Sequence, residues 1–401
     1  MKQHLLSVDE ALEAVLAGAR PVEEIEQIAT LEASGRVLAR AQSSSLDVPP
    51  MDNSAMDGYA VRVADVTTPG VRLRIAQRIP AGSVGTPLEP GTAARIFTGA
   101  PIPPGADAVV MQEFCSVESG QVVVQRAPER GAWIRRAASD IRGGAEILAA
   151  GIRLRPQDTG LAASVGIASL PVRRRVRLAL FFTGDELVMP GKPLAPGRIY
   201  NSNRFTLRGL SGMHGCEVRD YGIVPDRLDT TRDVLRRAAA ENDVIVTSGG
   251  VSVGDEDHVK PAVEAEGSLL MWRIAMKPGR PLAFGRVGSA AFLGLPGNPV
   301  SSFVTFVLFV RPFLLRTQGI AQVQPRAIEA RADFDWPEPD ARREFLRVKW
   351  NPGGGLDLYP TQDSAVLTSV AWADGLVDNP PEHAIRRGER VRFLPFAELY
   401  R

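Results

Sequence analysis

The sequence predicts a multidomain protein in which one α/β domain is combined with β-rich domains. Three observations support this fold class. Apolar runs alternate with helical patterns through residues 174–318, Pro and Gly punctuate short strand-like runs through 46–144, and strand-like runs return in 319–401. A chain of 401 residues is also long enough for roughly two to four domains.

The N-terminal part of the chain predicts helices on both sides of a β-rich segment. Ser7 and Glu10 have the spacing of a capping box, which indicates a helix over residues 7–16. A second helical pattern covers residues 22–32. A third helix is expected over 156–166, where a proline occupies the first turn.

The β-rich segment is interpreted as an insertion. Runs such as 71–75 and 121–125 predict short strands within a β domain of residues 46–144. Its helical flanks, 1–45 and 145–173, are expected to pack together as one discontinuous N-terminal linker domain of mixed structure.

Residues 174–318 predict a three-layer α/β domain with a parallel sheet, because strands that alternate with helices are connected through crossovers. The expected strands are 176–182, 217–221, 244–246, 281–284 and 290–293, and the expected helices are 201–215, 229–241, 258–266 and 300–315.

Residues 319–401 predict a small C-terminal domain with a β-barrel-like fold. Strand-like runs occur at 331–334, 347–350 and 389–393, and three consecutive glycines at 353–355 indicate a turn between two strands.

Composition is that of a soluble globular protein, with 44% apolar residues, 23% charged residues and a net charge of +1. A nearly neutral chain has no bulk reason to bind nucleic acid or an anionic membrane. Asp9 and Glu10 follow the N-terminus too closely for a signal peptide, and the apolar stretch 303–310 is too short to span a bilayer. Cys115 and Cys216 cannot form a disulfide framework, and the four scattered histidines lack zinc-ligand spacing. We therefore expect a cytoplasmic protein.

Four loops of the α/β domain carry the residue types that handle phosphates and oxyanions. They are 183–186, 248–255, 277–281 and 295–299, and each comes at or near the end of an apolar run. Loops at the carboxyl ends of strands share one edge of an open α/β sheet, and ligands bind there. The spacing therefore predicts a binding site at this edge.

The loop after strand 244–246 is rich in serine and glycine, which leaves backbone N–H groups available to an anion. Its acidic end, 255–257, indicates a bound cation such as Mg²⁺, which takes one or two carboxylates together with substrate oxygens. The alternative is a tight strand-to-helix turn, for which one or two glycines suffice. The candidate residues are Ser248, Gly249, Gly250, Ser252 and Gly254 for substrate and Asp257 for metal.

Two acidic side chains are expected beside that loop. Thr183 and Gly184 precede Glu186, a candidate metal ligand or general base, and Asp226 follows the next strand at the same edge. A surface turn is the alternative interpretation of this segment.

The remaining two loops supply cations and a helix N-terminus. Lys277 and Arg280 flank a rigid turn and can hold oxyanions, although a solvated hairpin tip would look similar. The loop containing Pro296, Gly297 and Asn298 precedes a long helix, whose first amides lack intrahelical partners.

Polar residues of the inserted β domain form weaker candidates. Asp57, Thr98, Arg135 and Asp140 lie in turn-like segments. On pattern alone, local hydrogen bonding within a loop explains them better than function does.

Seven segments together carry a family resemblance that covers nearly the whole chain. They include Asp-Asn-Ser-Ala-Met-Asp-Gly-Tyr-Ala at 52–60, Thr-Gly-Ala-Pro at 98–101 and the segment 105–113, followed by 183–187, 248–255, 277–279 and 295–299. In this order they resemble the molybdopterin molybdenumtransferase family, MoeA, whose eukaryotic relative is the gephyrin E domain.

The resemblance implies a reaction and an assembly. Adenylylated molybdopterin and molybdate are expected to give molybdenum cofactor with release of AMP, aided by Mg²⁺. The α/β domain is expected to be of the MogA/MoaB type. An elongated homodimer is also implied, in which Asp57, Thr98 and Asp140 complete the site of the other subunit. A molybdopterin adenylyltransferase and molybdoenzymes or carrier proteins are possible partners.

The resemblance also assigns roles to matching positions. Asp57, Glu186, Asp226 and Asp257 are expected to serve metal and adenylyl-phosphate chemistry. Lys277, Arg280 and Ser252 are expected to hold phosphate or molybdate. Arg347 and Ser364 match molybdate positions of the family in the C-terminal domain.

Two other functions remain open from the sequence. One is an adenylyltransferase similar to MogA, or a nucleotide-pyrophosphate hydrolase, with the same kind of α/β domain; consumption of ATP would identify the adenylyltransferase. The other is a non-enzymatic scaffold or sensor that binds molybdate or molybdopterin without turnover.

Overall fold

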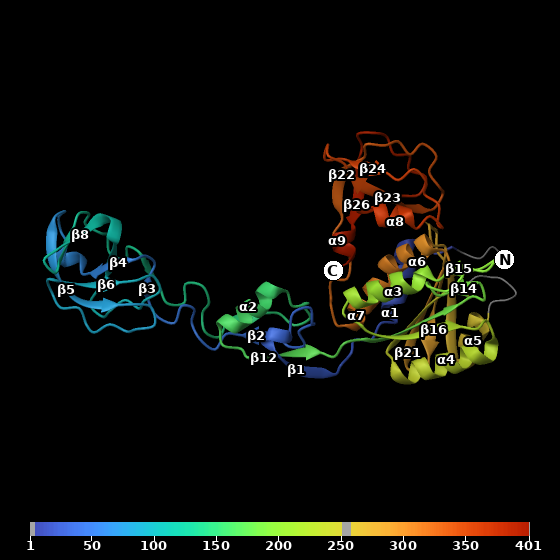
Figure 1. The fold of residues 1–401 in the computed structure, drawn as a ribbon, viewed down its shortest axis with the longest axis horizontal. Coiled ribbons are helices and arrows are strands. Elements are labelled where there is room, and N and C mark those ends of the chain that lie inside the picture. The colour runs from blue at the N-terminus through green and yellow to red at the C-terminus, as the bar shows by residue number, and fades with distance from the viewer. Residues whose placement is uncertain (1–4, 251–257, 401) are drawn as a thin grey trace.

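The computed structural model describes residues 5–250 and 258–400. Figure 1 shows an elongated molecule in which the inserted β domain lies at one end, and the α/β and C-terminal domains lie at the other. A narrow middle domain connects the two ends (Figure 1). The multidomain fold class predicted from the sequence is therefore confirmed, while the exact domain limits remain an interpretation.

The α/β domain contains a six-stranded mixed sheet. Its strand order is β16 (Glu217–Val224), β13 (Arg177–Thr183), β17 (Val244–Ser248), β21 (Ala290–Leu295), β20 (Pro281–Val287) and β18 (Gly267–Arg273). The first four strands are parallel, as predicted. The expectation of a wholly parallel sheet is wrong, because β20 and β18 join as antiparallel strands and β18 was not foreseen.

Helices cover both faces of this sheet and form three layers. One face packs against α1 (Val8–Ala17), α3 (Ser202–Met213) and the helix that follows β21. The other face packs against α4 (Leu228–Glu241) and α5 (Val259–Glu266). Strand residues alternate between the two cores, as Leu180 and Phe182 do on one side and Phe181 on the other. The helix α1 thus packs on the α/β domain, although it is separated from it in sequence.

The helix after β21 is continuous and deeply buried. It comprises α6 (Pro299–Thr305), a π-helical turn (Phe306–Val310) and α7 (Arg311–Thr317). By length and composition this helix is apolar enough to cross a bilayer, but 89% of its most apolar window is buried inside the protein. The helix expected over 300–315 is therefore present, and it forms part of the protein core.

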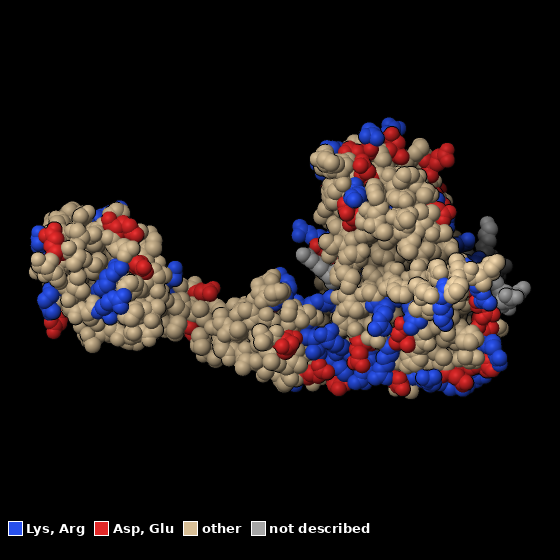
Figure 2. Space-filling view, in the orientation of Figure 1, with Lys and Arg blue, Asp and Glu red and all other residues tan. Residues whose placement is uncertain are grey.

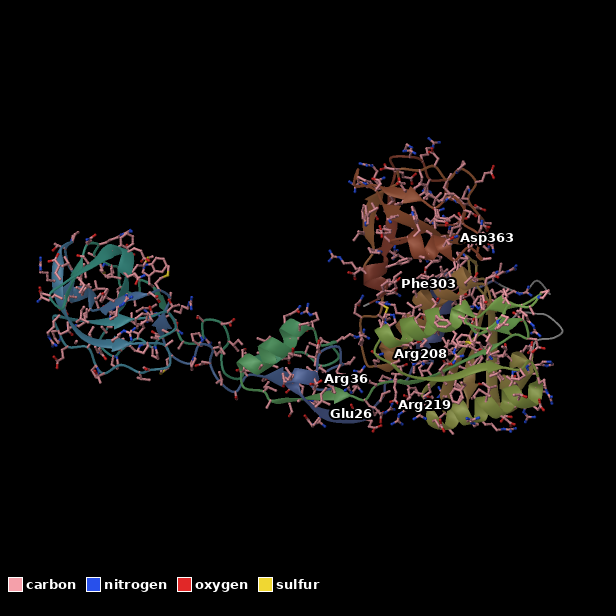
Figure 3. The ribbon with its side chains drawn as sticks, in the orientation of Figure 1. Glu26, Arg36, Arg208, Arg219, Phe303 and Asp363 are labelled. Carbon is pink, nitrogen blue, oxygen red and sulfur yellow. The ribbon has the colours of Figure 1, made fainter. Side chains whose placement is uncertain are left out.

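The middle domain contains β1 (Ile25–Ala29), β2 (Gln42–Ser43), β11 (Glu146–Leu148), α2 (Pro156–Ser164) and β12 (Ser169–Arg173). The helix predicted over 22–32 is wrong, since β1 occupies 25–29 and a 3₁₀ turn occupies Thr30–Glu32. Antiparallel pairing of Ile25 with Arg173 overrides the local helical pattern. Arg36 and Glu26, both labelled in Figure 3, form an ion pair in this domain.

The inserted domain is built on a second six-stranded sheet. Its order is β7 (Ala108–Met111), β4 (Gly58–Val61), β6 (Thr92–Ile96), β5 (Val71–Ile79), β9 (Gln121–Val124) and β8 (Cys115–Glu118). Two short strands, β3 (Asn53–Ser54) and β10 (Ile134–Arg135), pair beside it. The predicted β character of this segment is confirmed.

The C-terminal domain adds a third six-stranded sheet. It contains β19 (Met276–Lys277), β23 (Arg343–Trp350), β25 (Gly375–Asn379), β26 (Arg390–Pro395), β22 (Ile328–Arg331) and β24 (Leu356–Leu358), with helices α8 (Thr368–Trp372) and α9 (Phe396–Leu399). Strand β19 comes from the α/β segment and pairs with β23, so the two domains share this sheet. Figure 2 shows acidic and basic side chains interspersed over both domains, in keeping with the small net charge.

His214 is buried near two cations at the end of α3. Its ring stacks on Phe306 with centroids 6.2 Å apart. Burial, followed by the charges of Arg311 and Arg153, lowers the pKa of His214 to about 3. Because the unfolded chain binds the proton near its ordinary pKa of about 6.5, protonation favours unfolding between these two values.

We predict that His214→Leu reduces the acid sensitivity of the fold. The wild-type free energy of unfolding should be unaffected by this group above pH ~6.5 and should fall as the pH drops toward 3, by at most about 1.4 kcal/mol per pH unit from this residue. Denaturant unfolding of both proteins across this range measures the difference in slope. Identical slopes would contradict a neutral, buried imidazole.

Candidate functional site

A cleft of about 820 Å³ lies at the carboxyl ends of β13, β17 and β21. Ten of the candidate residues line this cleft: Thr183, Gly184, Glu186, Asp226, Ser248, Gly249, Gly250, Pro296, Gly297 and Asn298. Segments 199–203 and 365–367 contribute further walls. The predicted edge of the sheet therefore does bring most of the candidate loops together.

Strand pairing explains why these loops meet. Phe182 pairs with Ser248, and Ser248 pairs with Leu295, so the three strands end at the same level. Thr183 and Ser248 are both only 3% exposed. The hydroxyls at the base of the cleft are thus held on the ends of buried strands, which are more rigid than loops.

Gly249 and Gly250 are required by close packing. Both have positive φ angles, of 94° and 65°. A Cβ on Gly249 would lie 2.5 Å from the carbonyl oxygen of Thr183, and one on Gly250 would lie 2.5 Å from Val259 Cγ2. Only glycine tolerates both a positive φ angle and the lack of space for a Cβ atom. The two glycines therefore allow the backbone of this turn to pack closely against Thr183.

Asn203 connects two walls of the cleft, a role that was not predicted from the sequence. Its Nδ2 donates to Ser248 Oγ and to the carbonyl of Gly297, each at 2.8 Å. Ser248 Oγ in turn donates to the carbonyl of Pro296 at 2.8 Å. The position of Asn203 in the first turn of a helix that follows a sheet-edge loop was the available signal.

Two carboxylates face the cleft and are suited to a hard cation. Glu186 is exposed, Asp226 is partly buried, and both line the cleft. Among residues 5–250 and 258–400, no cluster of three or more His, Cys, Asp or Glu could hold a metal by protein ligands alone. The candidates Ser252, Gly254 and Asp257 lie outside the described residues.

The two predicted cations, Lys277 and Arg280, are not among the residues that line the cleft. Lys277 Nζ lies 3.4 Å from Glu344 and 3.5 Å from Asp340, both in the C-terminal domain. Arg280 is exposed, and the next residue, Pro281, lines the cleft. Lys277 thus binds acids across the domain boundary in this structure.

The C-terminal candidates differ in position. Ser364 Oγ accepts a hydrogen bond from Asn298 Nδ2 at 3.0 Å, which places it next to the cleft. Arg347 is 1% exposed, and its guanidinium donates to the carbonyls of Phe345 and Asp363 at 3.1 and 3.2 Å. Burial lowers the pKa of Arg347 to about 10. In this structure the guanidinium N–H groups of Arg347 therefore hold backbone segments of the C-terminal domain together.

The remaining candidates lie together in the inserted domain. Asp57 accepts hydrogen bonds from the backbone N–H and from the hydroxyl of Thr98, each at 2.8 Å. The Thr98 backbone bond, followed by the hydroxyl bond, holds the pKa of Asp57 below its usual value, so the carboxylate is ionised at neutral pH. Arg135 and Asp140 are exposed in the same domain.

These inserted-domain residues are remote from the cleft of their own chain. Figure 1 places the inserted domain and the α/β domain at opposite ends of the molecule, with the middle domain between them. Within a single chain, the candidate residues therefore form two separate groups, one at the cleft and one in the inserted domain.

Family models match three consecutive parts of the chain. The MoeA N-terminal region (domain I and II) matches residues 6–166, the probable molybdopterin-binding domain matches 179–316, and the MoeA C-terminal region (domain IV) matches 329–396.

Individual proteins match over the same extent. The molybdopterin molybdenumtransferase of Haemophilus influenzae is 39% identical and covers 98% of this chain and 100% of the relative. Molybdopterin molybdenumtransferase 2 of Mycobacterium tuberculosis is 37% identical over 88% of this chain and 90% of the relative. The crystal structure of the MoeA protein of Pyrococcus horikoshii is 30% identical, with a TM-score of 0.85 over 98% of this chain and 100% of that chain.

The three-layer domain, the inserted sheet and these matches define a class of multidomain transferases. The chain belongs to the molybdopterin molybdenumtransferase family, MoeA. It is therefore an enzyme of molybdenum cofactor biosynthesis, and the family and enzyme class predicted from the sequence are confirmed.

We predict that Asn203→Ala loosens the cleft while leaving the fold intact. Loss of two hydrogen bonds should cost about 1–3 kcal/mol of stability, and ligand binding in the cleft should weaken because two loops lose their link. Thermal unfolding and activity assays measure both effects. Arg208→Ala on the same helix (Figure 3) is the matched control, since the exposed Arg208 forms, among the described residues, one long ion pair of 3.8 Å with Asp220. Equal behaviour of the two variants would contradict the assignment.

Proposed function

We propose that the chain inserts molybdate into adenylylated molybdopterin and releases AMP in a Mg²⁺-dependent reaction. The observation that carries this proposal is the cleft itself, which combines two carboxylates, buried hydroxyls and tight glycine turns at the carboxyl edge of the sheet. Ligands of open α/β sheets bind at this edge.

The base of the cleft is suited to phosphate oxygens. Thr183 Oγ1 is buried without a hydrogen-bond partner among the described residues, and so is Asn201 Nδ2 in the neighbouring wall. Unpaired buried polar groups cost stability, and a bound substrate that satisfies them recovers that cost. In the proposed complex, Thr183 and Asn201 bind and orient the adenylyl-phosphate group.

The donor set of the cleft also fits Mg²⁺. This cation takes one or two protein carboxylates and completes its shell with water and phosphate oxygens. Glu186 and Asp226 supply such carboxylates from two neighbouring loops, and Asp257 is proposed as a third. When bound, the cation would neutralise charge on the phosphate oxygens as the phosphate bond breaks.

A homodimer is proposed to complete the site. In a dimer, Asp57, Thr98, Arg135 and Asp140 of one subunit can reach the cleft of the other, which their own chain does not allow (Figure 1). Exposed apolar side chains also favour an assembly. Ile199, in the short strand β15 (Ile199–Tyr200) at the cleft, is 54% exposed, and Phe205 and Met213 on α3 are 56% and 53% exposed.

The proposal includes cytoplasmic action and transient exchange with other proteins of the same biosynthesis. An adenylyltransferase would supply the adenylylated substrate, and molybdoenzymes or carrier proteins would accept the product. The rival adenylyltransferase activity would consume ATP, whereas the proposed reaction produces AMP from a substrate that is already adenylylated.

We predict that Asp226→Ala preserves the fold but lowers Mg²⁺-dependent AMP release by on the order of a hundredfold or more, because a charge-stabilising carboxylate is removed from the cleft. The assay uses purified adenylylated molybdopterin, molybdate and a Mg²⁺ titration. Asp229→Ala is the control, since Asp229 pairs with Arg227 on the surface outside the cleft. Full activity of Asp226→Ala would refute its role.

We predict that two inactive variants restore each other in mixed dimers. Asp57→Ala and Asp226→Ala chains should each be inactive alone. A mixed dimer has one intact site if the site is shared between subunits, so random mixing should restore roughly a quarter of wild-type activity. Subunit exchange followed by the AMP-release assay measures this. If the mixture stays inactive although mixed dimers form, each site belongs to one chain.

A further inference from the structure

We propose that a second cavity, between Arg20 and Arg286, binds a tetrahedral oxyanion of the phosphate or molybdate type. The cavity has a volume of about 490 Å³ and is separate from the candidate active site. No part of the molybdenumtransferase function proposed above uses it.

The cavity lies at the opposite end of the sheet from the cleft. Val244 and Ala291, which line it, are at the amino ends of β17 and β21. The cleft lies at the carboxyl ends of the same strands, beyond Ser248 and Leu295. Five residues of extended strand span about 16 Å, so the two cavities do not share a ligand.

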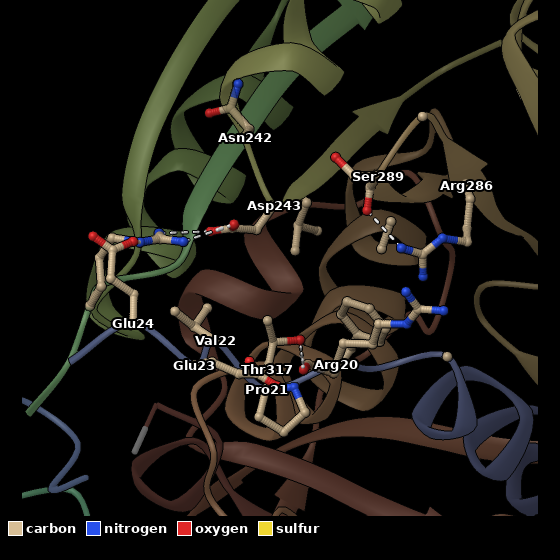
Figure 4. A pocket seen from close by; sticks show the side chains of 16 residues that line it. Arg20, Pro21, Val22, Glu23, Glu24, Asn242, Asp243, Arg286, Ser289 and Thr317 are labelled. Carbon is tan, nitrogen blue, oxygen red and sulfur yellow. Dashed lines mark hydrogen bonds and ion pairs between the residues drawn. The ribbon is translucent and has the colours of Figure 1, made fainter.

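Two guanidinium groups meet in this cavity without a carboxylate partner. Figure 4 shows Arg20 and Arg286 next to each other, and the charge of Arg20 acts on Arg286. Arg20 is exposed and Arg286 is partly buried, and neither forms an ion pair with a carboxylate of the described residues. Arg286 donates one hydrogen bond, to the carbonyl of Ser289 at 2.7 Å. Adjacent like charges repel, and an anion between them relieves the repulsion.

The environment strengthens the case for a bound anion. Burial, with a smaller effect from Arg20, holds the pKa of Arg286 below its usual value. A guanidinium that is partly shielded from water keeps N–H groups that need acceptors. An oxyanion can accept two parallel hydrogen bonds from them. Ser289 lines the same side of the cavity and can contribute its hydroxyl.

The acidic residues of the cavity lie toward its other end. Glu24 and Asp243 both bind Arg174, at 2.7 and 3.0 Å, and Figure 4 shows this cluster away from Arg20 and Arg286. Glu23 also lines the cavity and is exposed, and no ion pair joins it to Arg20 or Arg286 among the described residues. These carboxylates therefore leave the charge of the two arginines uncompensated.

The experiment measures oxyanion binding by the full-length protein. Equilibrium dialysis with labelled inorganic phosphate, and separately with labelled molybdate, gives the number of sites per chain and their affinity. We expect Arg20→Ala to weaken one site at least about tenfold for one or both anions, and Arg20→Glu to abolish it, since both remove a charge-assisted donor. Sites in the cleft should be unaffected, and AMP release should stay at the wild-type level.

Controls separate this site from general charge effects. Arg40→Ala removes an exposed arginine of the middle domain and should change nothing, whereas Arg20→Lys should retain part of the binding. Crystals soaked in molybdate should show anomalous density between Arg20 and Arg286. If wild-type crystals show this density but Arg20→Glu binds both anions as tightly as the wild type in dialysis, the density is an adventitious ion only. That result would overturn the proposal. Unchanged binding of both anions in every folded Arg20 variant would also overturn it.

Discussion

The parallel register of β13, β17 and β21 is the constraint on which the candidate site depends. Phe182, Ser248 and Leu295 lie in line across the sheet, so three loops that are distant in sequence begin at one level. Each strand is buried on both faces, which fixes the register, because a slip of one residue would move side chains into the wrong core. The hydrogen bonds of Asn203 and the close approach of Gly249 to Thr183 then hold these loops together around the cleft.

Sequence reasoning found the parts of the fold that local pattern determines. Buried strands and amphipathic helices were recognised because their periodicity is strong, and the cleft followed from loops at the carboxyl ends of strands. Strand β1 was missed because its pairing with residues 169–173 is a long-range contact that leaves no local signal. The burial of Arg347 was equally invisible, since an arginine that donates to carbonyls has the same sequence signature as an anion-binding one, and its match to a molybdate position stays a prediction.

The length of the middle domain explains why the polar candidates fall into two groups. Antiparallel pairing of β1 with β12, and of β2 with β11, builds a connector that holds the inserted sheet away from the α/β domain. Asp57 and Thr98 are nevertheless locked together by two hydrogen bonds on an exposed surface. These bonds join two turns of the inserted domain, and in the proposed dimer the same ionised carboxylate would be presented to the second subunit.

Charge gives an independent reason to involve that second subunit. The described residues that line the cleft include the acids Glu186 and Asp226 but no Lys or Arg. Lys277 is bound to acids, and Arg347 is enclosed by carbonyls. Backbone amides and hydroxyls can orient phosphate oxygens but cannot balance their charge together with two carboxylates. In the proposed reaction, bound Mg²⁺, Arg280 next to the cleft-lining Pro281 and Arg135 of the second subunit would supply the balancing charge, and anion binding would then be coupled to assembly.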